Sequence, residues 1–176
     1  MNIEEFFELS AGKWFAHRTY TDLISKTSEE GKSELIIKSL PIDHPGVIQV
    51  CQKYQFDPKQ ATCSAKLYWD DITKLNQKKT GSMIIVLIPS TESPLLGKFL
   101  HQIPESNVSL HLPGSYKIGE DEALTLYVRV GNTYLEERLW FASPNLRMRV
   151  SVAKNAGGVS YTSFTSEIRM SDVTTK

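Results

Sequence analysis

The sequence predicts a mainly β protein, folded as an antiparallel barrel or sandwich that carries two helices. Many short segments alternate apolar and polar residues, turn-forming residues separate them, and only two segments have a helical apolar stripe. The 176-residue chain predicts one domain over residues 1–170 and a disordered tail over residues 171–176. A closed barrel of eight to ten strands would leave a central ligand pocket.

Composition excludes several classes of protein. Lysine plus arginine and aspartate plus glutamate both number 20, which argues against a general nucleic-acid binder. No apolar run reaches the roughly 18 residues that a membrane span needs. The N-terminus is acidic where a signal peptide would be basic, so we expect a cytosolic-type protein. Cys51 and Cys63 have no metal-ligand spacing and are predicted to be unpaired thiols.

The first helix is predicted over residues 2–9, where it could plug one end of a barrel. Asn2 is a suitable N-cap, and two glutamates follow in the first turn. The strand after it, over residues 13–20, places Trp14, Ala16 and Arg18 on one face. Trp14 could be a core residue that closes the barrel floor or a ligand contact, and the pattern leaves both open.

The second helix is predicted over residues 43–56, with Asp43 as its cap and Cys51 on its buried side. A polar turn is expected over residues 27–32, and a long loop with one short strand over residues 90–113. The remaining predicted strands cover residues 33–40, 62–69, 82–89, 98–101, 115–119, 123–130, 134–142, 147–154 and 159–170.

The stretch over residues 134–151 predicts a hairpin with a Ser-Pro-Asn turn, and one of its faces is apolar apart from Glu137. Two arginines on the other face, roughly 6.5 Å apart, could bind two carboxylates or both ends of one anionic ligand. A glutamate there could accept hydrogen bonds, and a tryptophan could stack on a flat ring. The alternative is a solvated outer face with weak cross-strand ion pairs. The polar face is predicted to carry Glu136, Arg138, Trp140, Arg147, Arg149 and Ser151.

Motifs for common catalysts are absent from the sequence. It contains no G-x-S-x-G, no P-loop and no G-x-G-x-x-G. The four histidines have no metal-ligand spacing, so no metal site is predicted, and no nucleophile is paired with a base. Local patterns therefore favour a binding protein or ligand carrier over a hydrolase. The histidines are His17, His44, His101 and His111.

Several segments, in order and spacing, carry a resemblance that spans nearly the whole chain. They are Phe6–Ser10 with Gly12–Trp14, Ser28–Ser33, Gly119–Leu126, Glu136–Arg147 and Ser163–Met170. On these segments the chain resembles the S/U-type phycobiliprotein lyases, the CpeS/CpcS group. The segment over residues 73–108 departs most and could determine substrate preference.

The resemblance implies a lipocalin-like (calycin) antiparallel β-barrel of about eight to ten strands, with an N-terminal helix and one internal helix. It implies non-covalent binding of an open-chain tetrapyrrole, phycoerythrobilin or a related bilin, as a substrate, with no permanently bound cofactor. The bilin would pass to a cysteine of an apo-phycobiliprotein subunit, such as phycoerythrin, where a thioether forms. A bilin reductase and a second copy of the chain are further candidate partners. The implied compartment is the cyanobacterial cytoplasm or the plastid stroma.

The resemblance also implies the binding residues. Arg147 and Arg149 would hold the bilin propionates, and Glu136 would accept hydrogen bonds from pyrrole N–H groups. Glu136 and Arg149 are the expected catalytic residues. Two alternatives stay open, a carrier of a fatty acid or similar anionic ligand and an assembly factor that only contacts protein; a colour change on mixing with bilin would separate them. The full predicted set is Trp14, Arg18, Trp69, Glu136, Arg138, Trp140, Arg147, Arg149 and Ser151.

Overall fold

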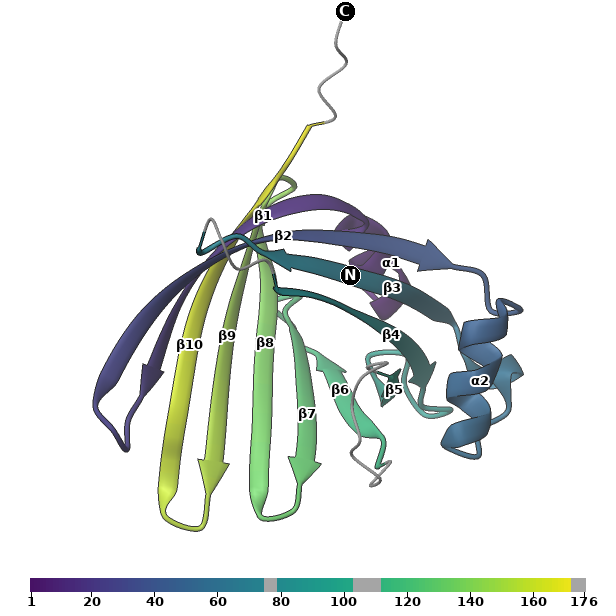
Figure 1. Ribbon diagram of the computed structural model, residues 1–176. Coiled ribbons are helices and arrows are strands. Elements are labelled where there is room, and N and C mark those ends of the chain that lie inside the picture. Colours follow the sequence, from purple (N-terminus) through teal and green to yellow (C-terminus); the bar gives the residue numbers. More distant parts are fainter. Residues whose placement is uncertain (75–78, 103–111, 172–176) are drawn as a thin grey trace, which may run out of the picture.

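The computed structural model describes residues 1–74, 79–102 and 112–171, and this part of the chain forms a closed antiparallel barrel of ten strands (Figure 1). Neighbouring strands in the sequence are also neighbours in the barrel, and β10 closes it against β1. Both helices and the strand number agree with the prediction. The strands are β1 Gly12–Asp22, β2 Thr27–Leu40, β3 Cys63–Asp71, β4 Lys79–Pro89, β5 Leu96–Gln102, β6 Gly114–Ile118, β7 Leu124–Val130, β8 Thr133–Ser143, β9 Leu146–Asn155 and β10 Gly158–Arg169.

Helix α1, Ile3–Ser10, plugs one end of the barrel, as the sequence predicted. A capping box fixes its start, because Asn2 and Glu5 exchange side-chain to backbone hydrogen bonds. Its buried Ile3 and Phe6 pack into the apolar cluster inside the barrel. The barrel is therefore closed at this end, and a ligand has to enter from the other.

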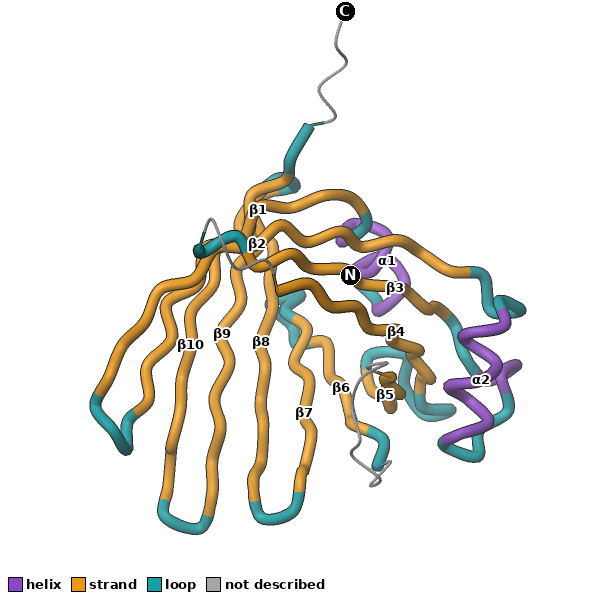
Figure 2. The backbone as a smooth tube through the Cα atoms, in the orientation of Figure 1, coloured by secondary structure: helices purple, strands orange, loops and turns teal. Residues whose placement is uncertain are grey.

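Helix α2, Pro45–Lys53, lies outside the barrel against β4 and β5 (Figure 2). Val47, Val50 and the fully buried Cys51 cover the apolar outer side chains of these two strands. The prediction that Asp43 caps the helix is wrong. His44 is the cap, and its Nδ1 accepts a hydrogen bond from the Gly46 amide at 3.1 Å, because Pro45 begins the helix.

Two predicted irregular segments differ in the structure. Residues 27–32, predicted as a turn, are the first part of β2, and the turn itself lies at residues 23–26. This part of β2 is polar because its side chains are mostly exposed, so the alternation that marks a half-buried strand is missing. The predicted short strand in the loop is the longer β5. Residues 103–111 of that loop and residues 172–176 of the predicted tail lie outside the described residues.

Candidate functional site

The register between β8 and β9 decides which side chains face the interior. A bulge between Phe141 and Ser143 shifts the pairing by one residue. Arg147 therefore lies opposite Phe141, and Arg149 opposite Leu139. Because directly opposite residues share a face of the sheet, both arginines point into the barrel.

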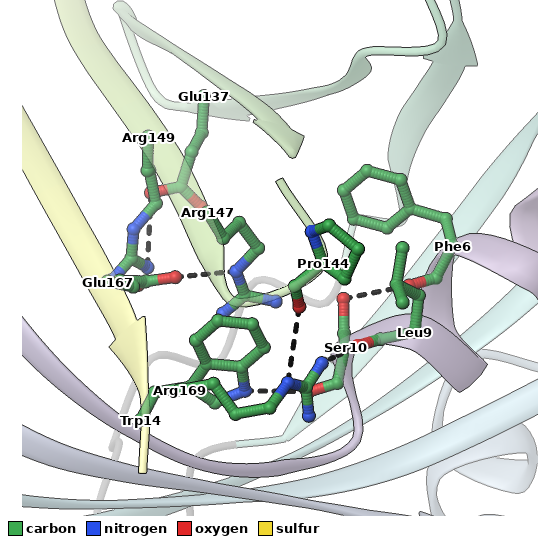
Figure 3. A network of polar contacts seen from close by, with 10 residues as sticks. All are labelled: Phe6, Leu9, Ser10, Trp14, Glu137, Pro144, Arg147, Arg149, Glu167 and Arg169. Carbon is green, nitrogen blue, oxygen red and sulfur yellow. Dashed lines mark hydrogen bonds and ion pairs between the residues drawn. The ribbon is translucent and has the colours of Figure 1, made fainter. Parts of the chain in front are cut away.

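A buried charge network lies near the plugged end of the barrel (Figure 3). The Glu167 side chain on β10 is completely buried and accepts hydrogen bonds from Arg147 Nε at 2.5 Å and from Arg149 Nη2 at 2.6 Å. Arg149 Nη1 lies 3.6 Å from Glu137 Oε1, which also accepts a hydrogen bond from Ser151 Oγ at 2.8 Å. Two cations and two anions thus balance each other without a ligand.

Burial and pairing shift the pKa values in this network in opposite directions. Burial would raise the pKa of Glu167, but Arg149 and Arg147 outweigh it and hold that pKa below its usual value. Burial lowers the pKa of Arg147, although Glu167 opposes this shift. Arg149 is also desolvated, but Glu167 and Glu137 raise its pKa above the usual value. Glu167 and Arg149 are therefore charged at neutral pH, and Arg147 is charged because a guanidinium group does not lose its proton in proteins.

Three predicted site residues lie on the outer face of β8, and the expectation that they share a face with Arg149 is wrong. Glu136 pairs with Lys154 at 3.6 Å, and Arg138 forms an ion pair with Asp121. Trp140 lies opposite Met148, away from the interior. The physical reason is the bulge, because a register shift of one residue moves a whole strand arm to the other face.

Trp14 belongs to the barrel floor and is fully buried. Its Nε1 donates a hydrogen bond to the Ser10 carbonyl at 2.9 Å, which ties β1 to the end of α1. The guanidinium carbons of Arg147 and Arg169 lie 5.1 and 4.2 Å from the centre of its ring (Figure 3). Of the two interpretations of Trp14 that the sequence left open, a core residue or a ligand contact, the structure supports the core residue.

Above this floor lies a cavity of about 370 Å³, within the usual size range of ligand pockets. Arg18 on β1 and Arg149 on β9 line it, and both lie opposite Thr165 of the intervening β10. Two strand spacings separate the two arginines, or about 10 Å. Leu67, Trp69 and Met83 are among the apolar lining residues.

The indole ring of Trp69 lies in space that is free only because the residue opposite it on β4, Gly81, has no side chain. A Cβ added to Gly81 would lie 2.3 Å from the Trp69 ring, so any larger residue would displace the indole. The ring is thereby kept against the β4 backbone, where it forms part of the cavity wall. Gly81 is a structural determinant of the site that the sequence analysis did not single out.

A second, more polar cavity of about 770 Å³ continues toward the open end. It shares Arg18, Asp71 and Lys79 with the first cavity, so the two are continuous. Tyr20 is among the residues that line only the outer part. Hydrogen bonds from Thr73 keep the pKa of Asp71 below its usual value, so the entrance carries charges of both signs.

The sequence analysis placed neither acid of the buried charge network, Glu137 or Glu167, in the site. Glu137 was visible as the single polar residue on an otherwise apolar face. Glu167 follows Ser163 and Thr165 at alternate positions of β10, and all three are buried. Buried polar residues at every second position were the signal, since such a strand lines a polar interior.

Both cysteine thiols are poor nucleophiles. Burial raises the pKa of Cys63 to about 12, and burial also raises the pKa of Cys51. Since the thiolate is the reactive form, neither side chain is activated at neutral pH.

We expect Cys51→Ser and Cys63→Ser to leave bilin binding and transfer largely intact. Each substitution buries a hydroxyl and should lower the free energy of unfolding by about 1–3 kcal/mol. Thermal unfolding and pigment transfer would be measured on each purified variant. Loss of transfer by a normally folded variant would instead indicate a covalent relay through that thiol.

Comparison with known proteins relates this geometry to a family. The CpeS-like protein family model matches residues 2–170. The chain belongs to the CpeS-like family. This agrees with the resemblance predicted from the sequence.

Individual relatives of this CpeS-like protein match over most of their length. A chromophore lyase CpcS/CpeS of Thermosynechococcus vestitus is 44% identical, covering 97% of this chain and 93% of the relative. A phycocyanobilin lyase subunit CpcS of a Picosynechococcus strain is 31% identical, covering 95% and 85%. The solved structure of the S-type phycobiliprotein lyase CPES from Guillardia theta matches with a TM-score of 0.83 at 30% identity, covering 98% and 94%. Among the described residues, no helix is long and apolar enough to cross a membrane.

Proposed function

We propose that this CpeS-like protein is a bilin lyase. It binds an open-chain tetrapyrrole non-covalently, phycoerythrobilin or a close relative, and delivers it to a cysteine of a phycobiliprotein subunit such as phycoerythrin. The observation that carries the proposal is the cavity with Arg18 and Arg149 on one side and an apolar wall around Trp69 on the other. An elongated, conjugated ligand with two propionates matches both parts.

In this proposal, arginine side chains bind the charged groups of the bilin and apolar side chains bind its rings. Arg149 is 27% exposed and reaches the cavity, whereas Arg147 is only 4% exposed and does not line it. Arg18 and Arg149 therefore hold the propionates, since arginine matches the geometry of a carboxylate. Arg147 holds Glu167, and Glu167 in turn orients Arg149. Trp69 packs against the conjugated rings.

Glu137 takes the role that the sequence assigned to Glu136. Its carboxylate faces the interior beside Arg149 and Ser151. There it can accept hydrogen bonds from pyrrole N–H groups and favour the protonated form of the bilin. Glu136 lies outside the barrel and has no route to a ligand in the cavity.

The acceptor subunit supplies the nucleophile. Addition of its thiol across the exocyclic double bond of the bilin forms one C–S bond and one C–H bond, so the step needs no oxidant or reductant. The contribution of the barrel is to hold the bilin extended, to exclude stray thiols and to present the reactive end. The high pKa of Cys63 supports this assignment, because the carrier then does not capture its own cargo.

The test combines binding, release and transfer. Mixed with phycoerythrobilin or phycocyanobilin, the purified protein should shift the absorption band, and acid urea should release the pigment. Co-expression with candidate apo-subunits and a bilin pathway should then give a pigmented subunit that keeps its colour after denaturation. Binding without transfer to any subunit would indicate a carrier, and no spectral change with either bilin would refute the proposal.

A further inference from the structure

The inner surface of β4 lacks a side chain at one position beside the cavity. Side chains alternate along a strand, so Gly81 and Met83 share the inner face of β4. In the row of Met83, the residue opposite on β3 is Leu67, and both side chains line the cavity. In the row of Gly81, the residue opposite is Trp69. A large aromatic side chain therefore lies beside a position that has none.

The two neighbours of Trp69 in its row determine where the indole lies. On β2 the residue opposite Trp69 is Leu35, a buried member of the apolar core cluster. On β4 it is Gly81, where an added Cβ would lie 2.3, 2.4 and 2.7 Å from three atoms of the indole. The ring thus covers the Gly81 backbone, on the side away from Leu35. A glycine inside a strand often marks such a close approach.

A side chain at residue 81 would push the indole into the cavity. Carbon atoms in ordinary contact lie about 3.5–4.0 Å apart, so the ring would have to move by about 1.2 Å or more. Strands β3 and β4 pair without interruption on both sides of this position, so the ring moves more easily than the backbone. Leu35 blocks the direction of β2. The remaining direction leads toward Arg149 and Thr165, which line the same cavity from β9 and β10.

We propose that Gly81 determines how flat and wide a ring system the cavity accepts. This inference rests on the proposed binding of a bilin and names the residue that makes space for its rings. With Gly81, the indole lies against β4, and a planar conjugated ligand fits between Trp69 and the strands across the barrel. A displaced indole narrows this gap, so the ligand is either rejected or twisted. Gly81 touches no ligand and is a positioning residue that acts through Trp69.

A single methyl group tests the assignment. Gly81→Ala should lower the affinity for phycocyanobilin at least about tenfold, as is usual when a packed site is overfilled. The bilin that still binds should show a weaker visible band at shorter wavelength, because twisting the bonds between the rings shortens the conjugated system. Titration with phycocyanobilin and full absorption spectra would measure both effects. An unchanged band with unchanged affinity in a folded variant would overturn the inference.

Gly31→Ala is the matched control. Gly31 also lies inside a strand beside the cavity, opposite Arg18 in the pairing of β1 with β2. An added Cβ there would lie 3.6 Å from Thr73 Oγ1 and 3.8 Å from Arg18 Nη2, which are ordinary contacts. The substitution should therefore change the affinity less than about twofold. Equal losses in Gly31→Ala and Gly81→Ala would show that the clash with the indole is not the cause.

A double variant tests whether the effect passes through the indole. Trp69→Leu removes the ring, so adding Gly81→Ala to it should change the affinity for phycocyanobilin less than about twofold further. The same pair also tests folding, because the double variant contains no clash. A tenfold loss that persists in the Trp69→Leu background would overturn the role of the indole.

The ligand-free protein gives an independent measurement. Near-ultraviolet circular dichroism should differ between the parent and Gly81→Ala, and this difference should vanish in the Trp69→Leu background. An identical spectrum in a folded Gly81→Ala variant would overturn the inference while leaving the proposed function intact. A parent protein that binds no bilin would refute the proposed function, and the inference with it.

Discussion

Replacing Glu167 by glutamine is expected to lower the free energy of unfolding by about 3–5 kcal/mol, the usual cost of breaking a buried ion pair. The Glu167 carboxylate is fully buried and bonded to Arg147 and Arg149. Without it, Arg147 keeps its charge in a site that excludes water, and Glu137 is the remaining nearby anion. Urea unfolding of the parent and the variant would measure the difference.

Two controls distinguish the stability cost of leaving a buried charge unpaired from the smaller cost of losing an ion pair. Glu34→Gln removes an exposed pair with Lys13, at 3.0 Å, and should cost less than about 1 kcal/mol. The double variant Arg147→Met/Glu167→Leu removes both charges and should recover much of the lost stability, because an apolar pair of similar volume can replace a buried ion pair. Equal effects of Glu34→Gln and Glu167→Gln would contradict the buried network.

The same network predicts how stability depends on pH. The pKa of Glu167 is lowered in the folded chain, so its contribution is fully present above the ordinary glutamate pKa of about 4.5. The contribution is lost as the pH falls below that value toward the folded-state pKa. Between roughly pH 6 and pH 3, the free energy of unfolding should therefore decrease less with falling pH for Glu167→Gln than for the parent. Urea unfolding at each pH would measure it.

The second large effect is expected on bilin binding. Arg149→Gln removes a charge-assisted contact to a propionate, worth roughly 1.5–3 kcal/mol when desolvated, so affinity should fall about tenfold to a hundredfold. The absorption maximum should move little, because propionates lie outside the conjugated system. Glu137→Gln should instead shift or weaken the bound absorption band, because it removes the anion that favours a protonated chromophore. Titration with bilin and full spectra would distinguish the two results.

Glu136→Gln is the matched control for this experiment. Glu136 is adjacent to Glu137 on β8 but faces outward toward Lys154, so affinity and colour should both be unchanged. The opposite outcome, with Glu136→Gln altering the spectrum and Glu137→Gln silent, would mean that β8 and β9 pair without the bulge. A spectral shift from Arg149→Gln with only weaker binding from Glu137→Gln would reverse the two roles.

Much of the architecture follows from local pattern alone. The capping residues of α1 and the period-two alternation of the strands depend on neighbours within a few positions. Both cysteines could be placed in apolar surroundings for the same reason. Arg18, Trp69, Arg149 and Ser151 all face the interior or line the cavity, as their strand patterns and the family resemblance predicted.

The composition of the site depended on how two strands pair. A regular two-residue turn at Pro144 and Asn145 would place Trp140 opposite Arg149 and Arg138 opposite Ser151, as the hairpin prediction required. The bulge changes these partners to Leu139 and Glu137. Alternation predicts which residues of one strand share a face. It does not predict which of the two sets of side chains on the next strand lies on that same side of the sheet.

In the tertiary structure, the packing of Phe141 decides which side chains of β8 and β9 face the interior together. With the bulge, Phe141 faces inward, 5.1 Å from the ring of Phe6 on α1 and 6.2 Å from that of Trp14. Burying this ring against the plug of the barrel favours the shifted register, which also brings Glu137 to Arg149. The sequence by itself thus determined most of the strands, both helices and the inward-facing Arg18, Arg147 and Arg149, but not the position of Arg138. The contact between Phe141 and a helix more than a hundred residues earlier decided which glutamate joins them.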